Sequence, residues 1–225
     1  MSSTIRVAVI DDNKSVRASL TRLIKSAGFE AESYSSAREF LDASAPEQTD
    51  CVVTDMRMPD LDGLSLQEKL SESAPHLAVV FVTGHGDIST SVRAMRAGAI
   101  DFLEKPIDAE MLLGSISRAG DQSRRAKAAR LELLDLERRC SSLTPREHEV
   151  FALVTSGLLN KQVGAELGTT EKTVKVQRAR VMQKMRAASL AELVRMAQRI
   201  GIHSEGASSM PVRLSQTASA RDPLR

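Results

Sequence analysis

The sequence contains few aromatic residues and few cysteines. Of its 225 residues none is Trp, one is Tyr and five are Phe, so little aromatic surface is available for stacking single-stranded nucleic acid. Cys51 and Cys140 lie far apart without CxxC spacing, which predicts neither a disulfide framework nor a zinc site. We expect reduced cysteines, with Cys51 a small core residue in an apolar run rather than a redox sensor.

Long apolar segments are also missing. No stretch of about 18 apolar residues is present, and the N-terminus has the pattern of a strand instead of a charged and apolar signal sequence. We therefore expect a cytoplasmic protein that has no membrane partner.

The charges nearly balance overall but are unevenly distributed. Lys and Arg number 31 and Asp and Glu number 29, a net charge of +2. Residues 1–120 carry 12 basic and 18 acidic side chains, a balance of −6, whereas residues 121–225 carry 19 and 11, a balance of +8. This asymmetry indicates an acidic first half that could bind a cation and a basic second half that could bind a polyanion.

In the first half, short β-branched apolar runs alternate with amphipathic segments. The expected strands cover residues 5–10, 29–34, 51–55, 77–82 and 99–103. A helix is expected after each strand: following the cap Asn13, at 37–43, 64–70 and 88–97, and from near Asp108. This order predicts an α/β domain with a doubly wound, five-stranded parallel sheet covered on both faces.

Polar residues stand at the C-terminal ends of four of these strands. Asp11 and Asp12 follow the first, Asp55 ends the third, Thr83 the fourth, and Lys105 follows the fifth. These ends share one edge of a parallel sheet, so the side chains should converge. Three carboxylates so placed would repel one another unless a cation lay between them, and oxygen ligands suit Mg²⁺.

Such a cluster has a specific chemistry. A carboxylate beside Mg²⁺ can attack a phosphoryl group, which makes Asp55 a candidate phosphoacceptor; a solvated aspartate at a strand end is the alternative. Lys105 would then bind the phosphoryl oxygens, and the Thr83 hydroxyl would donate to them once they arrive.

The second half is predicted to be helical. Residues 121–140 form a charged, Ala- and Leu-rich pattern that fits a linker helix better than a coiled coil, because it lacks three to four clean heptads. Thr144, Pro145 and Glu147 make a capping box, and Asn160 and Thr170 are expected to cap later helices. The predicted helices are 145–156, 160–167, 171–185 and 190–200. A Gly-containing turn between the second and third indicates an all-α, four-helix, helix-turn-helix domain.

The third helix of this domain has a basic outward face. Lys172, Lys175 and Val176 could enter a major groove, where Lys175 can donate to guanine and Val176 can meet a thymine methyl. Other basic or hydroxyl side chains are placed for phosphates. The predicted DNA contacts are Lys161, Thr170, Lys172, Lys175, Val176, Arg178, Arg180 and Lys184.

Two known families share these motifs. The first half resembles the flavodoxin-like receiver domain of two-component response regulators in Asp11-Asp12, Asp55 with Met58-Pro59, Asp62-Gly63, Thr83-Gly84, Asp101-Phe102-Leu103 and Lys105-Pro106. The second half resembles the LuxR-type helix-turn-helix in Asn160-Lys161 and in residues 172–176. The pairing, together with the run at 83–87, is similar to the FixJ subgroup of the NarL family.

The resemblance implies site residues. A sensor histidine kinase would phosphorylate Asp55, with Mg²⁺ held by Asp11 or Asp12, Asp55 and the backbone carbonyl of Arg57. It also implies a cis bond before Pro106, which costs little at an X-Pro bond.

The resemblance implies a switch and its partners as well. Thr83 and Phe102 would change position on phosphorylation and remodel the face of the fourth helix and fifth strand. A homodimer formed through that face would bind double-stranded promoter DNA at an inverted repeat, with RNA polymerase as a further partner. A separate hypothesis is that Arg57 and His85 slow dephosphorylation by obstructing water.

We therefore expect a receiver domain at 1–120, a helical linker at 121–141, a helix-turn-helix domain at 142–203 and a disordered tail at 204–225. The favoured function is a transcription factor switched by phosphorylation, not an enzyme. A phosphohydrolase is the alternative, disfavoured because Arg57 stands where such enzymes usually carry a second acid. A receiver that acts only through protein partners is a third possibility.

Overall fold

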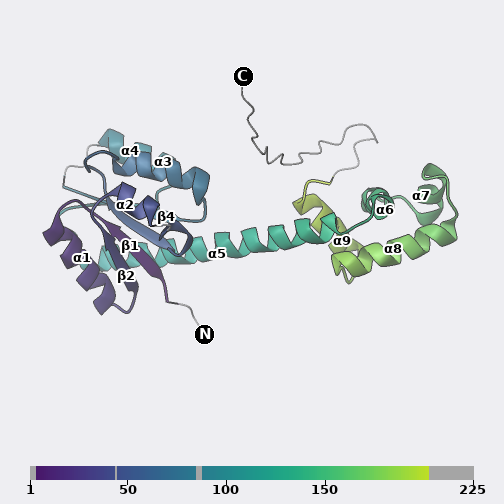
Figure 1. Cartoon of the computed structure of the whole chain (residues 1–225), viewed down its shortest axis with the longest axis horizontal. Helices are drawn as coiled ribbons and strands as arrows, with labels where there is room; N and C mark the ends of the chain where they lie inside the picture. The colour runs from purple at the N-terminus through teal and green to yellow at the C-terminus, as the bar shows by residue number, and fades with distance from the viewer. Residues whose placement is uncertain (1–3, 44, 85–87, 203–225) are drawn as a thin grey trace, which may run out of the picture. The chain divides into compact units, whose positions relative to one another are not determined.

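The computed structural model describes residues 4–43, 45–84 and 88–202 (Figure 1). They divide into two compact units, one ending at Leu131 and the other beginning at Glu132. The predicted tail at 204–225 lies outside the described residues.

The first unit contains a parallel sheet with strand order β2-β1-β3-β4-β5. Its strands are β1 (Arg6–Ile10), β2 (Glu30–Tyr34), β3 (Cys51–Asp55), β4 (Ala78–Thr83) and β5 (Asp101–Glu104). The predicted five-stranded parallel sheet is confirmed. Its last strand begins later than expected, because the Ala99 N–H donates to the Ala94 carbonyl and still belongs to the end of the preceding helix.

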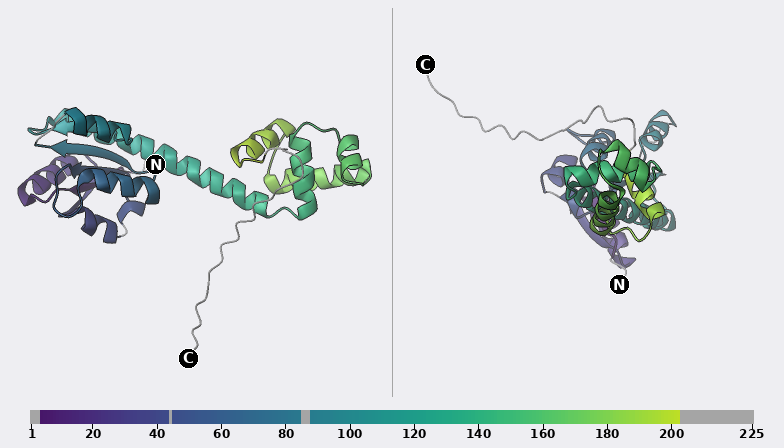
Figure 2. Two further views of the ribbon diagram at one scale, coloured as in Figure 1. Left: turned by 90° about the horizontal axis from the view of Figure 1, so that it is seen from above. Right: turned by 90° about the vertical axis from the view of Figure 1, so that its right-hand side faces the viewer.

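Helices cover both faces of this sheet (Figures 1 and 2). They are α1 (Lys14–Ser26), α2 (Ala37–Asp42), α3 (Gly63–Ser73), α4 (Ile88–Arg96) and α5 (Ala109–Ser141), with a short 3₁₀ helix, η1 (Ala45–Glu47). Alternate strand residues point to opposite faces. Ala8 and Val52 pack with α2, α3 and α4, whereas Val9 and Val53 pack with α1 and α5. The sheet is therefore doubly wound.

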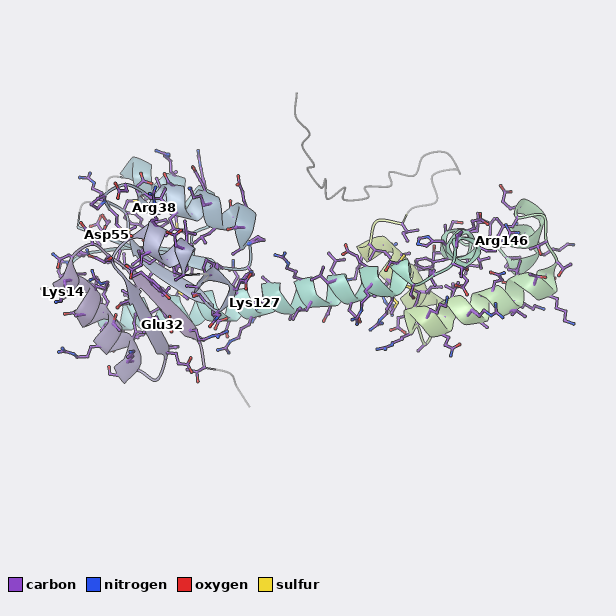
Figure 3. All side chains as sticks on the ribbon, in the orientation of Figure 1. Lys14, Glu32, Arg38, Asp55, Lys127 and Arg146 are labelled. Atoms are coloured by element: carbon purple, nitrogen blue, oxygen red, sulfur yellow. The ribbon has the colours of Figure 1, made fainter. Side chains whose placement is uncertain are left out.

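The residues predicted for the linker form the second half of α5, which continues without a break from Ala109 to Ser141. Within the first unit, Lys127 of this helix reaches the N-terminal end of β3 (Figure 3). Its Nζ lies 2.7 Å from both Asp50 Oδ1 and the Thr49 carbonyl oxygen, and Asp50 also accepts a hydrogen bond from the Arg6 N–H at 3.0 Å. The start of the linker is thus tied to the edge of the sheet opposite Asp55.

The second unit contains the end of α5 and four further helices. These are α6 (Pro145–Thr155), α7 (Asn160–Glu166), α8 (Glu171–Met185) and α9 (Leu190–Arg199). Phe151, Val174, Met185 and Leu193 are buried together in its core. The predicted four-helix domain is confirmed.

Capping defines where these helices begin. Thr144 and Glu147 form the predicted capping box, and the Thr170 hydroxyl caps α8 by accepting from the Thr173 N–H. The prediction that Asn160 caps α7 is wrong. The cap is Leu159, whose N–H donates to the Gln162 side chain at 2.8 Å, so Asn160 is already helical.

None of the described helices combines the length and the apolar character that crossing a bilayer requires.

We predict that Lys127→Met lowers the free energy of unfolding of the first unit by about 2 kcal/mol at pH 7, because a hydrogen-bonded charge pair is lost. Burial raises the pKa of Asp50, but the hydrogen bonds from Lys127 and Arg6 outweigh it and hold that pKa below its ordinary value. The stabilisation is therefore complete above the pKa of Asp50 in the unfolded chain and disappears as the pH falls through the folded-state pKa.

Urea unfolding of both proteins between pH 3 and pH 7 measures this difference. Arg125→Met, an exposed position on the same helix, serves as the matched control and should cost little. An equal loss in both variants, or a loss independent of pH, would contradict the role of the ion pair.

Candidate functional site

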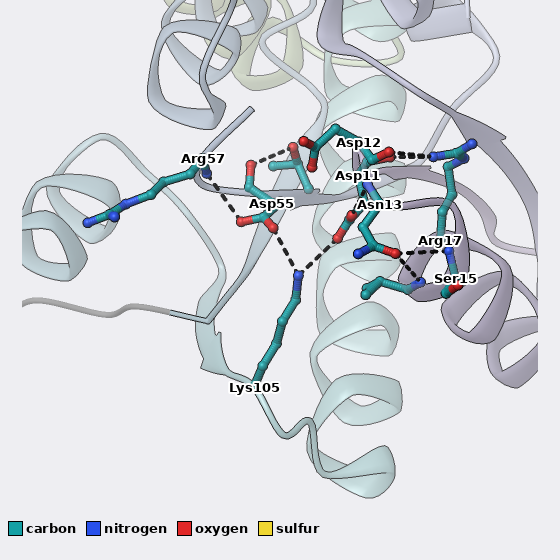
Figure 4. A network of polar contacts seen from close by, with 10 residues as sticks. Asp11, Asp12, Asn13, Ser15, Arg17, Asp55, Arg57 and Lys105 are labelled. Atoms are coloured by element: carbon teal, nitrogen blue, oxygen red, sulfur yellow. Dashed lines mark hydrogen bonds and ion pairs between the residues drawn. The ribbon is translucent and has the colours of Figure 1, made fainter. Parts of the chain in front are cut away.

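The C-terminal edge of the sheet carries an acidic cluster (Figure 4). Carboxylate oxygens of Asp11, Asp12 and Asp55 all lie within 4.8 Å of one another. Asp11 is buried, Asp55 is half-buried and Asp12 is exposed. The convergence predicted from the strand ends is present.

Lys105 lies between two of these carboxylates. Its Nζ is 2.9 Å from Asp55 Oδ2 and 3.0 Å from Asp11 Oδ2, and the bond to Pro106 is cis, as the resemblance implied. Partial burial lowers the pKa of Lys105, but the hydrogen bonds and attraction of Asp55 and Asp11 outweigh it and raise that pKa above its ordinary value. The amine is therefore a fixed positive charge at the site.

The loop after β3 packs closely against Asp55. The Gly63 N–H donates to the Met56 carbonyl at 3.0 Å, and a Cβ at Gly63 would lie 2.6 Å from the Asp55 carbonyl oxygen. The Arg57 N–H donates to Asp55 Oδ1 at 3.2 Å, while the exposed Arg57 side chain points away from that carboxylate (Figure 4). Glycine at position 63 thus allows the chain to approach the acidic cluster.

The donor set fits a hard divalent cation. Three carboxylates within 4.8 Å repel one another, and Lys105 compensates only part of their charge. Oxygen ligands, one of them on an exposed side chain beside solvent, suit Mg²⁺, which keeps several of its waters. Coordination by the backbone carbonyl of Arg57 stays a prediction.

The two predicted switch residues lie on neighbouring strands. Thr83 is buried at the end of β4, and its carbonyl accepts a hydrogen bond from the Lys105 N–H at 2.8 Å. The Phe102 ring on β5 is half-buried, with its centroid 6.4 Å from that of Phe81. His85 lies outside the described residues.

Sequence reasoning missed one residue at this edge. Arg17, on α1, directs Nη1 to the backbone carbonyl oxygens of Asp11 at 2.6 Å and Asp12 at 3.4 Å (Figure 4). The signal in the sequence was the position of Arg17, five residues after Asp12. This spacing alone does not distinguish Arg17 from a solvated arginine.

In the second unit, the candidate DNA-binding residues differ in the exposure of their side chains and in the partners that those side chains have within the domain. Lys161, Lys172, Val176 and Arg180 are exposed. Lys175 is also exposed and pairs with Glu171 at 3.1 Å, an interaction that contributes little between solvated groups.

Besides Thr170, which caps α8, two basic residues among the predicted phosphate contacts have partners inside the domain. Arg178 donates to Asn160 Oδ1 at 3.2 Å, and Lys184 donates to Glu147 Oε2 at 2.6 Å and to the Ser142 carbonyl at 3.0 Å. The hydrogen bond from Lys184 is the main reason that the pKa of Glu147 lies below its ordinary value. Both side chains therefore position α8, and phosphate contact by them stays a prediction.

A residue of α6 stabilises the turn of the helix-turn-helix by a hydrogen bond. Arg146 donates to the carbonyl of Leu167, the last residue before the Gly168 turn, and pairs with Glu149 at 2.7 Å (Figure 3). Gly164 packs against this turn so closely that a Cβ there would lie 2.9 Å from the Thr169 carbonyl oxygen. The geometry between α7 and α8 is thus fixed by contacts on two sides.

Comparison with known proteins decides the family. Residues 7–117 match the response regulator receiver domain, and residues 141–197 match the LuxR family of bacterial regulatory proteins. The chain is 46% identical over 196 residues to nodulation protein W of Bradyrhizobium diazoefficiens, covering 87% of this chain and 86% of that one. It is 42% identical over 206 residues to the transcriptional regulatory protein FixJ of Azorhizobium caulinodans, with coverages of 90% and 96%.

The chain belongs to the NarL/FixJ family of response regulators. Among solved structures, response regulator StyR is similar with a TM-score of 0.78 and 45% identity, covering 88% of this chain and all of that one. Full-length FixJ from B. japonicum is similar with a TM-score of 0.53 and 40% identity, with coverages of 88% and 98%.

This response regulator is a phosphorylation-regulated, DNA-binding transcriptional regulator of a two-component system. It is not a conventional enzyme, so the phosphohydrolase alternative is set aside. The receiver implies a kinase partner, and the LuxR-type domain implies binding to DNA.

We predict that Gly63→Ala destabilises the receiver by about 1 to 3 kcal/mol and slows phosphorylation, because its methyl group would collide with the Asp55 carbonyl. Gly114→Ala on α5 is the matched control. Its Cβ would meet only Arg118 Nη1 at 3.7 Å, so the change should be neutral or stabilise the helix by up to about 1 kcal/mol. Urea unfolding and the initial rate of phosphoryl incorporation measure both; equal effects at the two positions would contradict the close packing at Gly63.

Proposed function

We propose that Asp55 is the phosphoacceptor and that a sensor histidine kinase is the donor. Mg²⁺ would be bound by Asp11, Asp12, Asp55 and the backbone carbonyl of Arg57. The observation that carries this proposal is the meeting of Lys105 with a cluster of three carboxylates at the one edge where parallel sheets place their ligands.

The chemistry is a phosphoryl transfer from a phosphohistidine. An oxygen of the Asp55 carboxylate forms the new O–P bond, the N–P bond breaks, and its electron pair returns to the imidazole of the kinase. Lys105, which is 2.9 Å from Asp55 Oδ2, stabilises the negative charge of the phosphoryl oxygens from its fixed position. Bound Mg²⁺ supplies further positive charge to those oxygens.

The switch that follows uses Thr83 and Phe102. The Thr83 hydroxyl moves to the phosphoryl group, and the half-buried Phe102 ring turns inward into the space that Thr83 leaves. The face that changes includes α4, whose Val92 and Met95 side chains are 42% and 47% exposed. Exposed apolar side chains on α4, a helix that contacts β5, support this face as the surface of a phosphorylation-dependent homodimer.

The dimer binds double-stranded promoter DNA at an inverted repeat. When bound at a promoter, it is placed to contact RNA polymerase. Lys172, Lys175 and Val176 enter the major groove, where Lys175 donates to guanine and Val176 contacts a thymine methyl. The residues assigned to phosphates are Lys161, Thr170, Arg178, Arg180 and Lys184.

Phosphorylation of Asp55 is tested by intact mass after incubation with acetyl phosphate and Mg²⁺. The wild-type chain should gain the mass of one phosphoryl group and Asp55→Asn should gain none. Asp62→Asn, a nearby carboxylate that caps α3, is the control and should still be phosphorylated. An equal gain by wild type and Asp55→Asn would show that another residue is the acceptor.

We predict that Lys175→Ala relaxes specificity at a single base pair and costs about 1 to 3 kcal/mol at that position. Lys161→Ala should weaken binding to all sequences and reduce the salt dependence by about one phosphate contact. The measurement uses single-base variants of a duplex selected by wild type from a random pool. Uniform weakening by Lys175→Ala would rule out base reading by this residue.

A further inference from the structure

The loop between β1 and α1 must hold two adjacent acidic residues in place. The Asp11 side chain is fixed on both oxygens, since Oδ1 accepts from the Asn13 N–H at 2.8 Å and Oδ2 accepts from Lys105 at 3.0 Å. The bond from the Asn13 N–H also orients the peptide between Asp12 and Asn13, but neither contact reaches the peptide between Asp11 and Asp12, and the side chain of Asp12 is exposed.

The side chain of Arg17 hydrogen-bonds to the backbone of this loop. This half-buried residue donates from Nη1 to the Asp11 carbonyl at 2.6 Å and, more weakly, to the Asp12 carbonyl at 3.4 Å (Figure 4). The Arg17 N–H also donates to the Asn13 carbonyl at 3.0 Å, so α1 itself anchors the side chain. One arginine thus holds the two consecutive carbonyls of the residues that carry the carboxylates.

We propose that Arg17 is a positioning residue for the divalent cation site: it fixes the backbone of Asp11 and Asp12 so that their carboxylates stay directed at Asp55. The inference rests on the proposed function of this cluster as a Mg²⁺ site. Arg17 touches neither the cation nor the phosphoryl group, and acts through the loop.

Two effects of Arg17 on cation binding have opposite signs. Its positive charge near the cluster repels a cation, so removing the charge alone would tighten Mg²⁺ binding. Its hydrogen bonds order the loop, so removing them would weaken binding, as the loss of outer-shell partners at metal sites does. The direction of the change therefore distinguishes positioning from simple electrostatics.

The experiment measures Mg²⁺ dissociation constants of the full chain by calorimetry. Arg17→Met should weaken binding about tenfold, near the lower end of losses typical for outer-shell residues. Arg17→Lys, which keeps the charge and a donor nitrogen, should recover most of the affinity. Arg22→Met, at an exposed position of the same helix, removes the same charge and should leave binding unchanged or slightly tighter.

An electrostatic effect of Arg17 on α2 is tested in parallel. The pKa of Glu39 is lowered by hydrogen bonds from Ser35 and to a smaller extent by the charge of Arg17, so Arg17 also acts on α2. If Glu39→Gln reproduces the loss of Mg²⁺ affinity, the effect runs through α2 and the proposal is wrong.

Phosphorylation by acetyl phosphate supplies a second readout. In Arg17→Met the Mg²⁺ concentration for half-maximal rate should rise about tenfold while the rate at saturating Mg²⁺ is largely retained. A fall in the saturating rate with unchanged half-saturation, or Mg²⁺ binding as tight as in wild type, would overturn the proposal. Absence of Mg²⁺ binding by wild type would remove the cation site and this inference together.

Discussion

The structure depends on the repulsion among three carboxylates held at one edge of a sheet. Carboxylate oxygens of Asp11, Asp12 and Asp55 lie within 4.8 Å of one another because parallel strands end side by side, and hydrogen bonds and positive charge offset part of their repulsion. Lys105, the residue after β5, compensates part of this charge, and Arg17 hydrogen-bonds to the backbone of the loop that carries two of the acids. A cluster with excess negative charge is consistent with a site for a divalent cation.

Strand β3 links this edge to the start of the linker helix. Asp55 stands at its C-terminal end, and Asp50, directly before its first residue, pairs with Lys127 of α5 at 2.7 Å. The strand residues between them, Cys51 to Thr54, are buried. A buried strand with a carboxylate of the acidic cluster at one end and an ion-paired carboxylate at the other leaves little room for substitution along its length.

Much of this was accessible from the sequence because it depends on local patterns. Apolar runs followed by Asp55 or Thr83 predicted strands and their shared edge, and the capping box at Thr144 predicted where α6 begins. What escaped prediction depends on contacts between distant segments. Asn160 fits a helix cap, yet Gln162 satisfies the Leu159 N–H and Asn160 accepts from Arg178 instead. The ion pair between Lys184 and Glu147, 37 residues apart, and the bonds of Arg17 to backbone carbonyls leave no periodic signal.

We propose that phosphorylation of Asp55 controls DNA binding by the second domain. The most direct measurement is the affinity of the full chain for its selected duplex before and after phosphorylation, with the Asp55→Asn variant treated identically. We expect binding to tighten at least about tenfold, a coupling of about 1.4 kcal/mol, in wild type alone. Equal affinity with and without the phosphoryl group, or the same gain in Asp55→Asn, would contradict it.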